Sequence, residues 1–289
     1  MEVVPSLPKR ARSGGDDEIK ELILTEVAQE VRHERIAAVV EASSGSCDEQ
    51  RFVKMADREE DTDMTVDMLE SLHIGQSQSM WKGVAFGKCA CDWQVYASLI
   101  SELQPRTIID LGSWAGGSAL FFADFAQMLV DSSFCTVVSL DITLKNVRAV
   151  AREHPKIQFH ECSTQKLEQL FTQEFCATLP HPWLISEDAH YHFEKVLPVL
   201  HALMCPGDYL ICEDTSGQMH DWFDRNNQED DADERAHTMQ SIEQLRQKSK
   251  VLRYFCILHG EMYRCDTKYL DMFGYNVGKH WNSIVKRIK

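Results

Sequence analysis

The sequence predicts an α/β fold in which a central, mostly parallel sheet carries helices on both faces. From about residue 92, short apolar runs alternate with segments whose apolar residues recur at helical spacing. A glycine-rich turn follows the first of these runs, and acidic residues follow several later ones. Strands that alternate with helices are typical of parallel sheets with right-handed crossovers.

The elements follow one another in a regular order. The predicted strands are Thr107–Leu111, Thr136–Leu140, Ile157–His160, Trp183–Ser186 and Tyr209–Cys212. The predicted helices are Trp93–Leu103, Ser118–Leu129, Leu144–Glu153, Gln165–Phe171, His192–Leu203 and Met239–Lys248. We expect Val251–Leu258, together with the stretch 254–285, to supply the last strands of the sheet.

Three regions are predicted along the chain. Residues 1–17 are polar and contain Pro and Gly, which is typical of a disordered tail. Residues 18–80 are predicted as a helical extension and linker: apolar residues recur every four positions from Ile19 to Val31, and 41–63 is a Ser/Asp/Glu-rich linker or surface loop. The apolar helix face packs on its own domain, or it forms a dimer contact or a lid. Residues 81–289 form the α/β domain.

The composition of the chain argues against nucleic acid and membranes as binding partners. The 289 residues carry a formal net charge of −15, which disfavours wrapping of nucleic acid. The ten cysteines include no CxxC pair, as expected for the reduced thiols of a cytoplasmic protein. No segment reaches the ~18 apolar residues of a membrane span, so no membrane partner is expected. The acidic run at 224–236 is predicted as a solvated loop, with an acceptor entrance as the alternative.

The first candidate site is the glycine-rich turn after strand 107–111. Its glycines let a ligand approach the backbone, and the helix that follows offers unpaired N–H groups. Trp114 replaces the middle glycine of a dinucleotide fingerprint, so the loop suits an amino-acid carboxylate and amine better than a pyrophosphate. We expect Asp110 to lie close to the ligand's ammonium. The predicted donor-binding residues of the turn are Asp110, Gly112, Ser113, Gly116, Gly117 and Ser118.

The predicted nucleotide site is completed by two further residues, Asp141 and Ser163, that lie outside this turn. Asp141 ends the next strand, about thirty residues after Asp110, where an acid can accept both hydroxyls of a ribose. Ser163, just after the following strand, is a candidate contact on the adenine side.

Acidic residues follow two further strands. Glu187 and Asp188 come after strand 183–186, and Glu213 and Asp214 after strand 209–212. Carboxylates that converge at one sheet edge repel one another unless a cation lies between them, and Mg²⁺ is the hard divalent cation that suits oxygen ligands. Such an ion would favour deprotonation of an acceptor hydroxyl. His190 is predicted as the general base.

Together these residues resemble a family of methyltransferases, that of cephamycin biosynthesis and rhamnosyl O-methylation, often labelled cephalosporin-hydroxylase-like. The resemblance covers roughly residues 80–289. The matching segments are Trp81–Gly83 to Asp92, Asp110–Ser118, Glu187–His190, Gly207–Thr215 and Phe273–Asn276.

The resemblance implies a Rossmann-like class I methyltransferase fold for residues 81–289, S-adenosylmethionine as donor, and Mg²⁺ held by Glu187 or Asp188 with Glu213 and Asp214. The family usually has Asp where this chain has Glu187, so which residue of the pair reaches the metal stays open. The predicted function is Mg²⁺-assisted O-methylation of a small-molecule hydroxyl.

Three alternatives remain beside this prediction: metal-free N-methylation, a non-catalytic protein that binds S-adenosylmethionine for regulation, and a nicotinamide-dependent oxidoreductase. Trp114 argues against the last. A small-molecule methyl acceptor is the expected partner, and homo-oligomer formation is left open.

Overall fold

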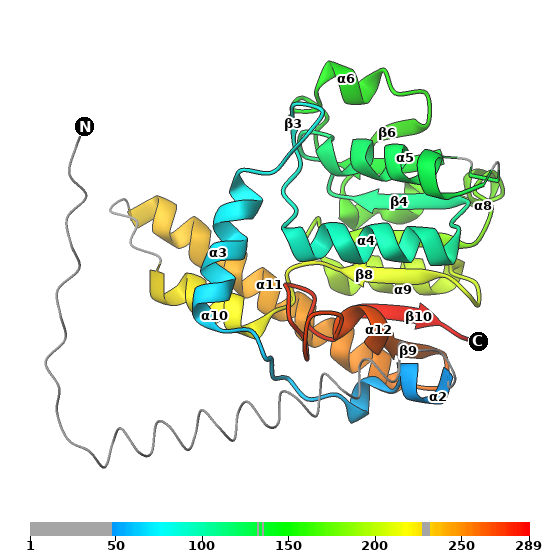
Figure 1. The fold of residues 1–289 in the computed structure, drawn as a ribbon. Helices are drawn as coiled ribbons and strands as arrows, with labels where there is room; N and C mark the ends of the chain where they lie inside the picture. Colours follow the sequence, from blue (N-terminus) through cyan, green and yellow to red (C-terminus); the bar gives the residue numbers. More distant parts are fainter. Residues whose placement is uncertain (1–47, 132, 135, 227–231) are drawn as a thin grey trace, which may run out of the picture.

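The computed structural model describes residues 48–131, 133–134, 136–226 and 232–289, coloured along the chain in Figure 1. The predicted tail (1–17), the predicted helix from Ile19 to Val31 and part of the acidic run 224–236 lie outside these residues. The described ends of that run belong to two helices, α10 and α11.

One eight-stranded sheet organises the molecule, with the strand order β1-β9-β10-β8-β7-β4-β5-β6. The five strands from β4 to β8 are parallel, whereas β10, β9 and β1 pair antiparallel along one edge. The parallel strands are β4 (Thr107–Leu111), β5 (Thr136–Asp141), β6 (Ile157–Glu161), β7 (Trp183–Glu187) and β8 (Tyr209–Cys212). The antiparallel strands are β1 (Phe52–Val53), β9 (Tyr263–Asp266) and β10 (Ile284–Arg287). A separate two-stranded ribbon joins β2 (Met80–Trp81) to β3 (Val84–Ala85).

Helices cover both faces of this sheet (Figure 1). The long ones are α4 (Ala90–Leu103) and α5 (Gly117–Leu129), which contact each other on one face, and α9 (Phe193–Leu203) and α11 (Ala232–Leu258), which contact each other on the other. Two more, α3 (Val66–Ser77) and α10 (Gly217–Asn226), lie to one side of the sheet. The remaining short elements are α2 (Asp48–Arg51), η1 (Met55–Asp57), α6 (Ala149–Arg152), η2 (Thr164–Lys166), α7 (Leu167–Leu170), α8 (Gln173–Cys176) and α12 (Thr267–Leu270).

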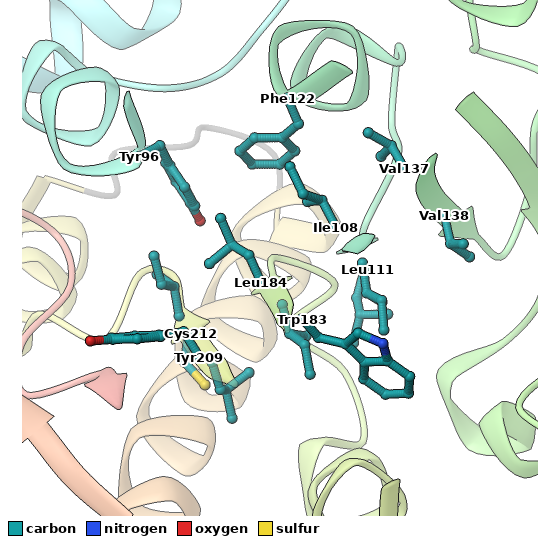
Figure 2. Packing of buried hydrophobic residues seen from close by; sticks show 14 of the residues in the cluster. Tyr96, Ile108, Leu111, Phe122, Val137, Val138, Trp183, Leu184, Tyr209 and Cys212 are labelled. Carbon is teal, nitrogen blue, oxygen red and sulfur yellow. The ribbon is translucent and has the colours of Figure 1, made fainter. Parts of the chain in front are cut away.

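The core lies between the sheet and its two helical layers. Every residue of β4 and β8 is buried, as expected for central parallel strands covered on both faces. Figure 2 shows Phe122 of α5 close to Ile108 of β4, with Leu184 and Trp183 of β7 further into the cluster. The interior therefore fixes the strand register, and with it the positions of the residues at the strand ends.

The predicted parallel strands are confirmed to within a residue at their ends, and helices lie between them, but the helix predicted at Leu144–Glu153 is only the four-residue α6. Two expectations about flanking segments are wrong. Val251–Leu258 is the last part of α11, not a strand. Its buried residues Leu252 and Cys256 are four apart and continue the buried face of Leu245, which is helical spacing. The segment 41–63 is also more than a linker, since its described part contains α2 and η1, and its strand β1 pairs with β9.

A second, smaller apolar cluster holds α3 against α10 and α11. It consists of Met64, Leu69, Met219, Leu245 and Val277, with Trp222 and Phe223 packed against it. This contact places α3 beside the carboxyl ends of the parallel strands. None of the helices described is long and apolar enough to cross a membrane.

Candidate active site

A pocket of about 740 Å³ lies where the parallel strands β4, β5, β7 and β8 end. Its walls come from the glycine-rich turn after β4, from Asp141 at the end of β5, and from the loops after β6, β7 and β8. Helix α3 and strand β3 supply the remaining wall. Carboxyl ends of parallel strands are the place where such sheets bind ligands, so the position agrees with the sequence prediction.

Close backbone contacts explain the glycines of the turn. A Cβ on Gly112, whose φ is +113°, would lie 2.9 Å from the backbone of Asp188. A Cβ on Gly117 would lie 2.1 Å from the carbonyl oxygen of Ala85. Only glycine allows the turn to pack against these two neighbours. Gly112, Ser113, Gly117 and Ser118 line the pocket, whereas Gly116, the N-cap of α5, does not.

Asp110 lies beneath the turn and not on the pocket wall. It is fully buried, and one carboxylate oxygen, Oδ2, accepts hydrogen bonds from Ser139 Oγ (2.7 Å) and Ser118 Oγ (3.0 Å). The other oxygen has no partner in the described chain. Burial raises the pKa of Asp110 to about 7. The structure therefore places Asp110 behind the pocket wall, where it holds the lining residue Ser118, and not beside the ligand as predicted.

Asp141 is on the pocket wall and supports the turn. Its Oδ2 accepts a hydrogen bond from the backbone N–H of Trp114 (2.8 Å), and it lines the pocket near Ile142. Trp114 is 56% exposed, so its side chain is free to cover a ligand. Ser163 also lines the pocket, and its hydroxyl accepts from the backbone of Gln165.

Asp188, His190 and Asp214 form a compact cluster at the other end of the pocket. One ligand atom from each lies within 4.8 Å of the others, and all three residues line the pocket. His190 Nε2 is 3.3 Å from Asp188 Oδ1 and 3.6 Å from Asp214 Oδ2. The donor set of two carboxylates and one imidazole is chemically suited to a divalent cation.

The other two predicted acids point into the protein, not into this cluster. Glu187 is fully buried and pairs with Lys248 Nζ at 2.6 Å. Glu213 accepts from Lys88 Nζ (2.6 Å), Tyr96 Oη (2.6 Å) and Ser186 Oγ (2.8 Å). The structure thus brings one acid of each predicted pair to the pocket and holds the other in a buried ion pair.

Three lysines that sequence reasoning missed balance most of this negative charge. Lys88, Lys248 and Lys279 are all buried and pair with Asp188 and Glu213, with Glu187, and with Asp214. Burial alone would lower the pKa of Lys88, but Asp188 and Glu213 outweigh it and raise that pKa well above its usual value. The repulsion between converging carboxylates, used to predict a metal, is therefore largely relieved by side chains.

His190 has both ring nitrogens engaged. Nδ1 lies 3.2 Å from Lys248 Nζ, and Lys248 is held in its charged form because the ion pair with Glu187 raises its pKa against the effect of burial. A charged ammonium only donates, so Nδ1 accepts and the proton of a neutral ring sits on Nε2, facing the two carboxylates. The base role predicted for His190 requires a free lone pair, and hence release of the Lys248 contact.

His73, on α3, is a further pocket residue that the sequence did not reveal. Its ring contacts Trp222 (centroids 5.4 Å apart) and Phe223 (5.2 Å), and it lines the pocket. Nδ1 is buried without a hydrogen-bond partner among the described residues. Burial lowers the pKa of His73, with Lys279 acting in the same direction. It lies before residue 81, in the segment predicted as an extension, where no motif points to a site.

The fold and the pocket together define a class of protein. A Rossmann-like sheet with an antiparallel edge, a glycine-rich turn after its first parallel strand and a pocket across the strand ends is the architecture of class I methyltransferases. The family described as rhamnosyl O-methyltransferase/CmcI matches residues 75–250, more than half of the 289 residues. This chain belongs to that family.

Individual relatives support the assignment. A rhamnosyl O-methyltransferase from Mycobacterium leprae is 31% identical over 152 residues, which are 48% of this chain and 62% of the relative. One from Mycobacterium tuberculosis is 28% identical over 153 residues, 50% of this chain and 60% of the relative. The chain therefore spans about three fifths of the length of these curated relatives.

Solved structures agree on the fold. A CmcI structure described as Mg-SAM superposes with a TM-score of 0.54 and 22% identity, covering 81% of this chain and 88% of that one. A CmcI structure described as SAH gives a TM-score of 0.52 at 22% identity and covers 81% and 95%. At this identity the likeness establishes the fold, and the predicted class I methyltransferase fold is confirmed.

Proposed function

We propose that this protein is a methyltransferase that transfers a methyl group from S-adenosylmethionine to a hydroxyl of a small molecule. The observation that carries the proposal is the single pocket that joins Asp141 and the glycine-rich turn at one end to Asp188, His190 and Asp214 at the other. One end has the features of a nucleoside site, and the other has groups that can position and activate an acceptor. The rhamnosyl O-methyltransferase names of the relatives support the same reaction class.

The donor end requires few specific groups. Asp141 is proposed to accept hydrogen bonds from the ribose hydroxyls, and Ser163 to lie at the adenine side. Gly112 and Gly117 keep the backbone bare, so the amino-acid part of the donor can approach the N-terminus of α5. Asp110, lying beneath the turn, would support the loop and not contact the donor directly.

The reaction is an in-line displacement. A bond forms between the acceptor oxygen and the methyl carbon while the bond from that carbon to the sulfonium sulfur breaks, and S-adenosylhomocysteine leaves. The acceptor proton must be lost, and most of the acceleration comes from holding oxygen, carbon and sulfur in line. The pocket supports this because donor and acceptor ends share one cavity.

The residues at the acceptor end fit a divalent cation such as Mg²⁺. Asp188 and Asp214 would hold it, with His190 Nε2 as the third member of the set once the Lys248 contact is released and the ring proton is carried by Nδ1. When bound, the cation would supply Lewis acidity that lowers the pKa of an acceptor hydroxyl. Lys88 pairs with Asp188 and Lys279 pairs with Asp214, so each carboxylate is held in place by a lysine that is not itself a member of the cluster.

A second candidate is methylation of an amine without metal. The observation that favours it is the charge balance, because three buried lysines already neutralise three of the four carboxylates. In that case Asp188, whose pKa is raised by burial and by Glu213, would accept the proton released by the acceptor.

Product formation tests both candidates. The purified protein is incubated with S-adenosylmethionine and matched hydroxyl and amine acceptors, and S-adenosylhomocysteine release is measured with and without EDTA. O-methylation that EDTA abolishes and Mg²⁺ restores supports the metal-assisted function. Turnover of amines that EDTA leaves unchanged supports the second candidate, and no release above the acceptor-free rate with any acceptor contradicts both.

A further inference from the structure

A second group of reactive side chains lies at the amino ends of the parallel strands, whereas the pocket lies at their carboxyl ends. His181 stands two residues before β7, and Cys205 and Asp208 precede β8. These are the amino ends of strands whose carboxyl ends carry the candidate active site. The two groups are therefore about 15 Å apart along a five-residue strand, and the proposed function gives this one no role.

The three side chains stand in a thiol–imidazole–carboxylate order. Cys205 Sγ lies 3.5 Å from His181 Nε2, within hydrogen-bond range for sulfur. The other ring nitrogen, Nδ1, lies 2.8 Å from Asp208 Oδ2 and 3.0 Å from Oδ1. This is the arrangement of a nucleophile, a base and a group that orients the base.

Asp208 holds both the Cys205 backbone and the His181 ring in place. It is fully buried, and its carboxylate also accepts from the backbone N–H of Cys205 (2.6 Å) and of Trp183 (2.7 Å). The ring of His181 stacks on Trp183, with centroids 4.3 Å apart and planes 15° from parallel. The imidazole and the thiol are thus held at a set separation, while Cys205 itself is exposed at the surface.

We propose that Cys205 is an activated thiol that forms mixed disulfides with small disulfides. His181 takes the proton of the thiol, the thiolate attacks one sulfur of the disulfide, a Cys205–sulfur bond forms, and the original S–S bond breaks to release the second sulfur as a thiolate. His181 and Pro206, the neighbour of Cys205 in the chain, line an open groove of about 500 Å³ together with Tyr209 and Lys286. It gives room for the body of the incoming molecule.

A bound metal explains the cluster less well. The nitrogen and sulfur that face each other supply two ligands, whereas protein zinc sites use three or four. Asp208 is engaged by His181 Nδ1 and two backbone N–H groups, so it orients the ring and does not complete a metal shell. The structure favours the thiol chemistry.

Reaction of the reduced 289-residue chain with 4,4′-dithiodipyridine at pH 7 tests the proposal. Modification of each cysteine is followed over time by mass spectrometry in the natural protein and in His181→Gln, which keeps a polar side chain near Asp208 but has no base. We expect Cys205 to react first, and its rate to fall at least about tenfold in the variant. The rate at Cys176, a half-buried thiol that is not a member of the cluster, should not change.

Circular dichroism and the unfolding midpoint establish that His181→Gln is folded before its rates are compared. Cys205→Ala should remove the first-reacting thiol and no other. An unchanged rate at Cys205 in His181→Gln would overturn the proposal, because exposure alone would then explain its reactivity. Protection of Cys205 by micromolar Zn²⁺ that is lost in His181→Gln would also overturn it, in favour of a metal site. Neither result depends on methyl transfer.

Discussion

Replacing Lys88 with methionine removes the cation that lies between Asp188 and Glu213. Lys88 Nζ is 2.5 Å from Asp188 Oδ2 and 2.6 Å from Glu213 Oε2, and its side chain is 1% exposed. Removal leaves two carboxylates without their partner in a buried site. Loss of one member of a buried ion pair typically costs roughly 3–5 kcal/mol. For a domain of this size each kcal/mol lowers Tm by about 2–4 °C, so we expect a drop of about 6–20 °C.

Thermal unfolding at pH 7.5 measures this effect, and Lys82→Met is the matched control. Lys82 also pairs with an aspartate, Asp124, but its side chain is 52% exposed, and an exposed pair contributes about 0–1 kcal/mol. The difference in Tm between Lys88→Met and the natural protein should become smaller as pH falls, because protonation neutralises the carboxylates that have lost their lysine partner. Equal, small shifts in the two variants would refute the view that buried lysines balance the site.

Three further predictions concern the turn, the buried acid and the cluster. Gly117→Ala should lower Tm strongly or prevent folding, because its Cβ would meet the carbonyl of Ala85. Its control is Gly75→Ala, in open space on α3, which should leave Tm unchanged or raise it slightly. Thermal unfolding of the two variants distinguishes these outcomes. Asp110→Asn should flatten the pH dependence of stability. With a folded pKa of about 7, Asp110 stabilises the fold fully below its unfolded pKa and loses that contribution as pH rises to 7. Denaturant titrations should therefore show the variant gaining stability relative to the natural protein as pH rises from about 4 to 7, with no further relative change above that pH. Asp214→Asn should abolish any effect of Mg²⁺ on acceptor turnover while leaving donor affinity within about twofold; unchanged Mg²⁺ dependence would exclude this carboxylate as a ligand.

The parallel part of the fold could be predicted from sequence because its central strands are short and fully buried. Thr107–Leu111 and Tyr209–Cys212 were predicted with the bounds that the structure has. Burial on both faces makes such a run mostly apolar, so its ends are marked clearly by the polar loops that flank it. Val251–Leu258 was misassigned for the converse reason: eight residues of a long amphipathic helix, taken alone, contain as many apolar residues as a strand.

The site was partly predictable for a similar reason. The turn after β4, Asp141 and the acids after β7 and β8 belong to strand ends, which topology brings together. Which acid of each pair faces the pocket depends on side-chain partners, and these come from distant elements: Lys88 precedes α4 and Lys248 lies on α11. A lysine on another helix carries no local signal, and so the charge balance could not be predicted.

Calorimetric titration of S-adenosylmethionine into the protein tests the central claim most directly, since it requires no knowledge of the acceptor. We predict one binding site, with affinity reduced at least about tenfold, or about 1.4 kcal/mol, in Asp141→Ala, and unchanged in Asp131→Ala, an exposed acid away from the pocket. Absence of binding heat over a range of temperatures at saturating donor, or equal affinity in Asp141→Ala and the natural protein, would contradict the assignment of this pocket as the donor site.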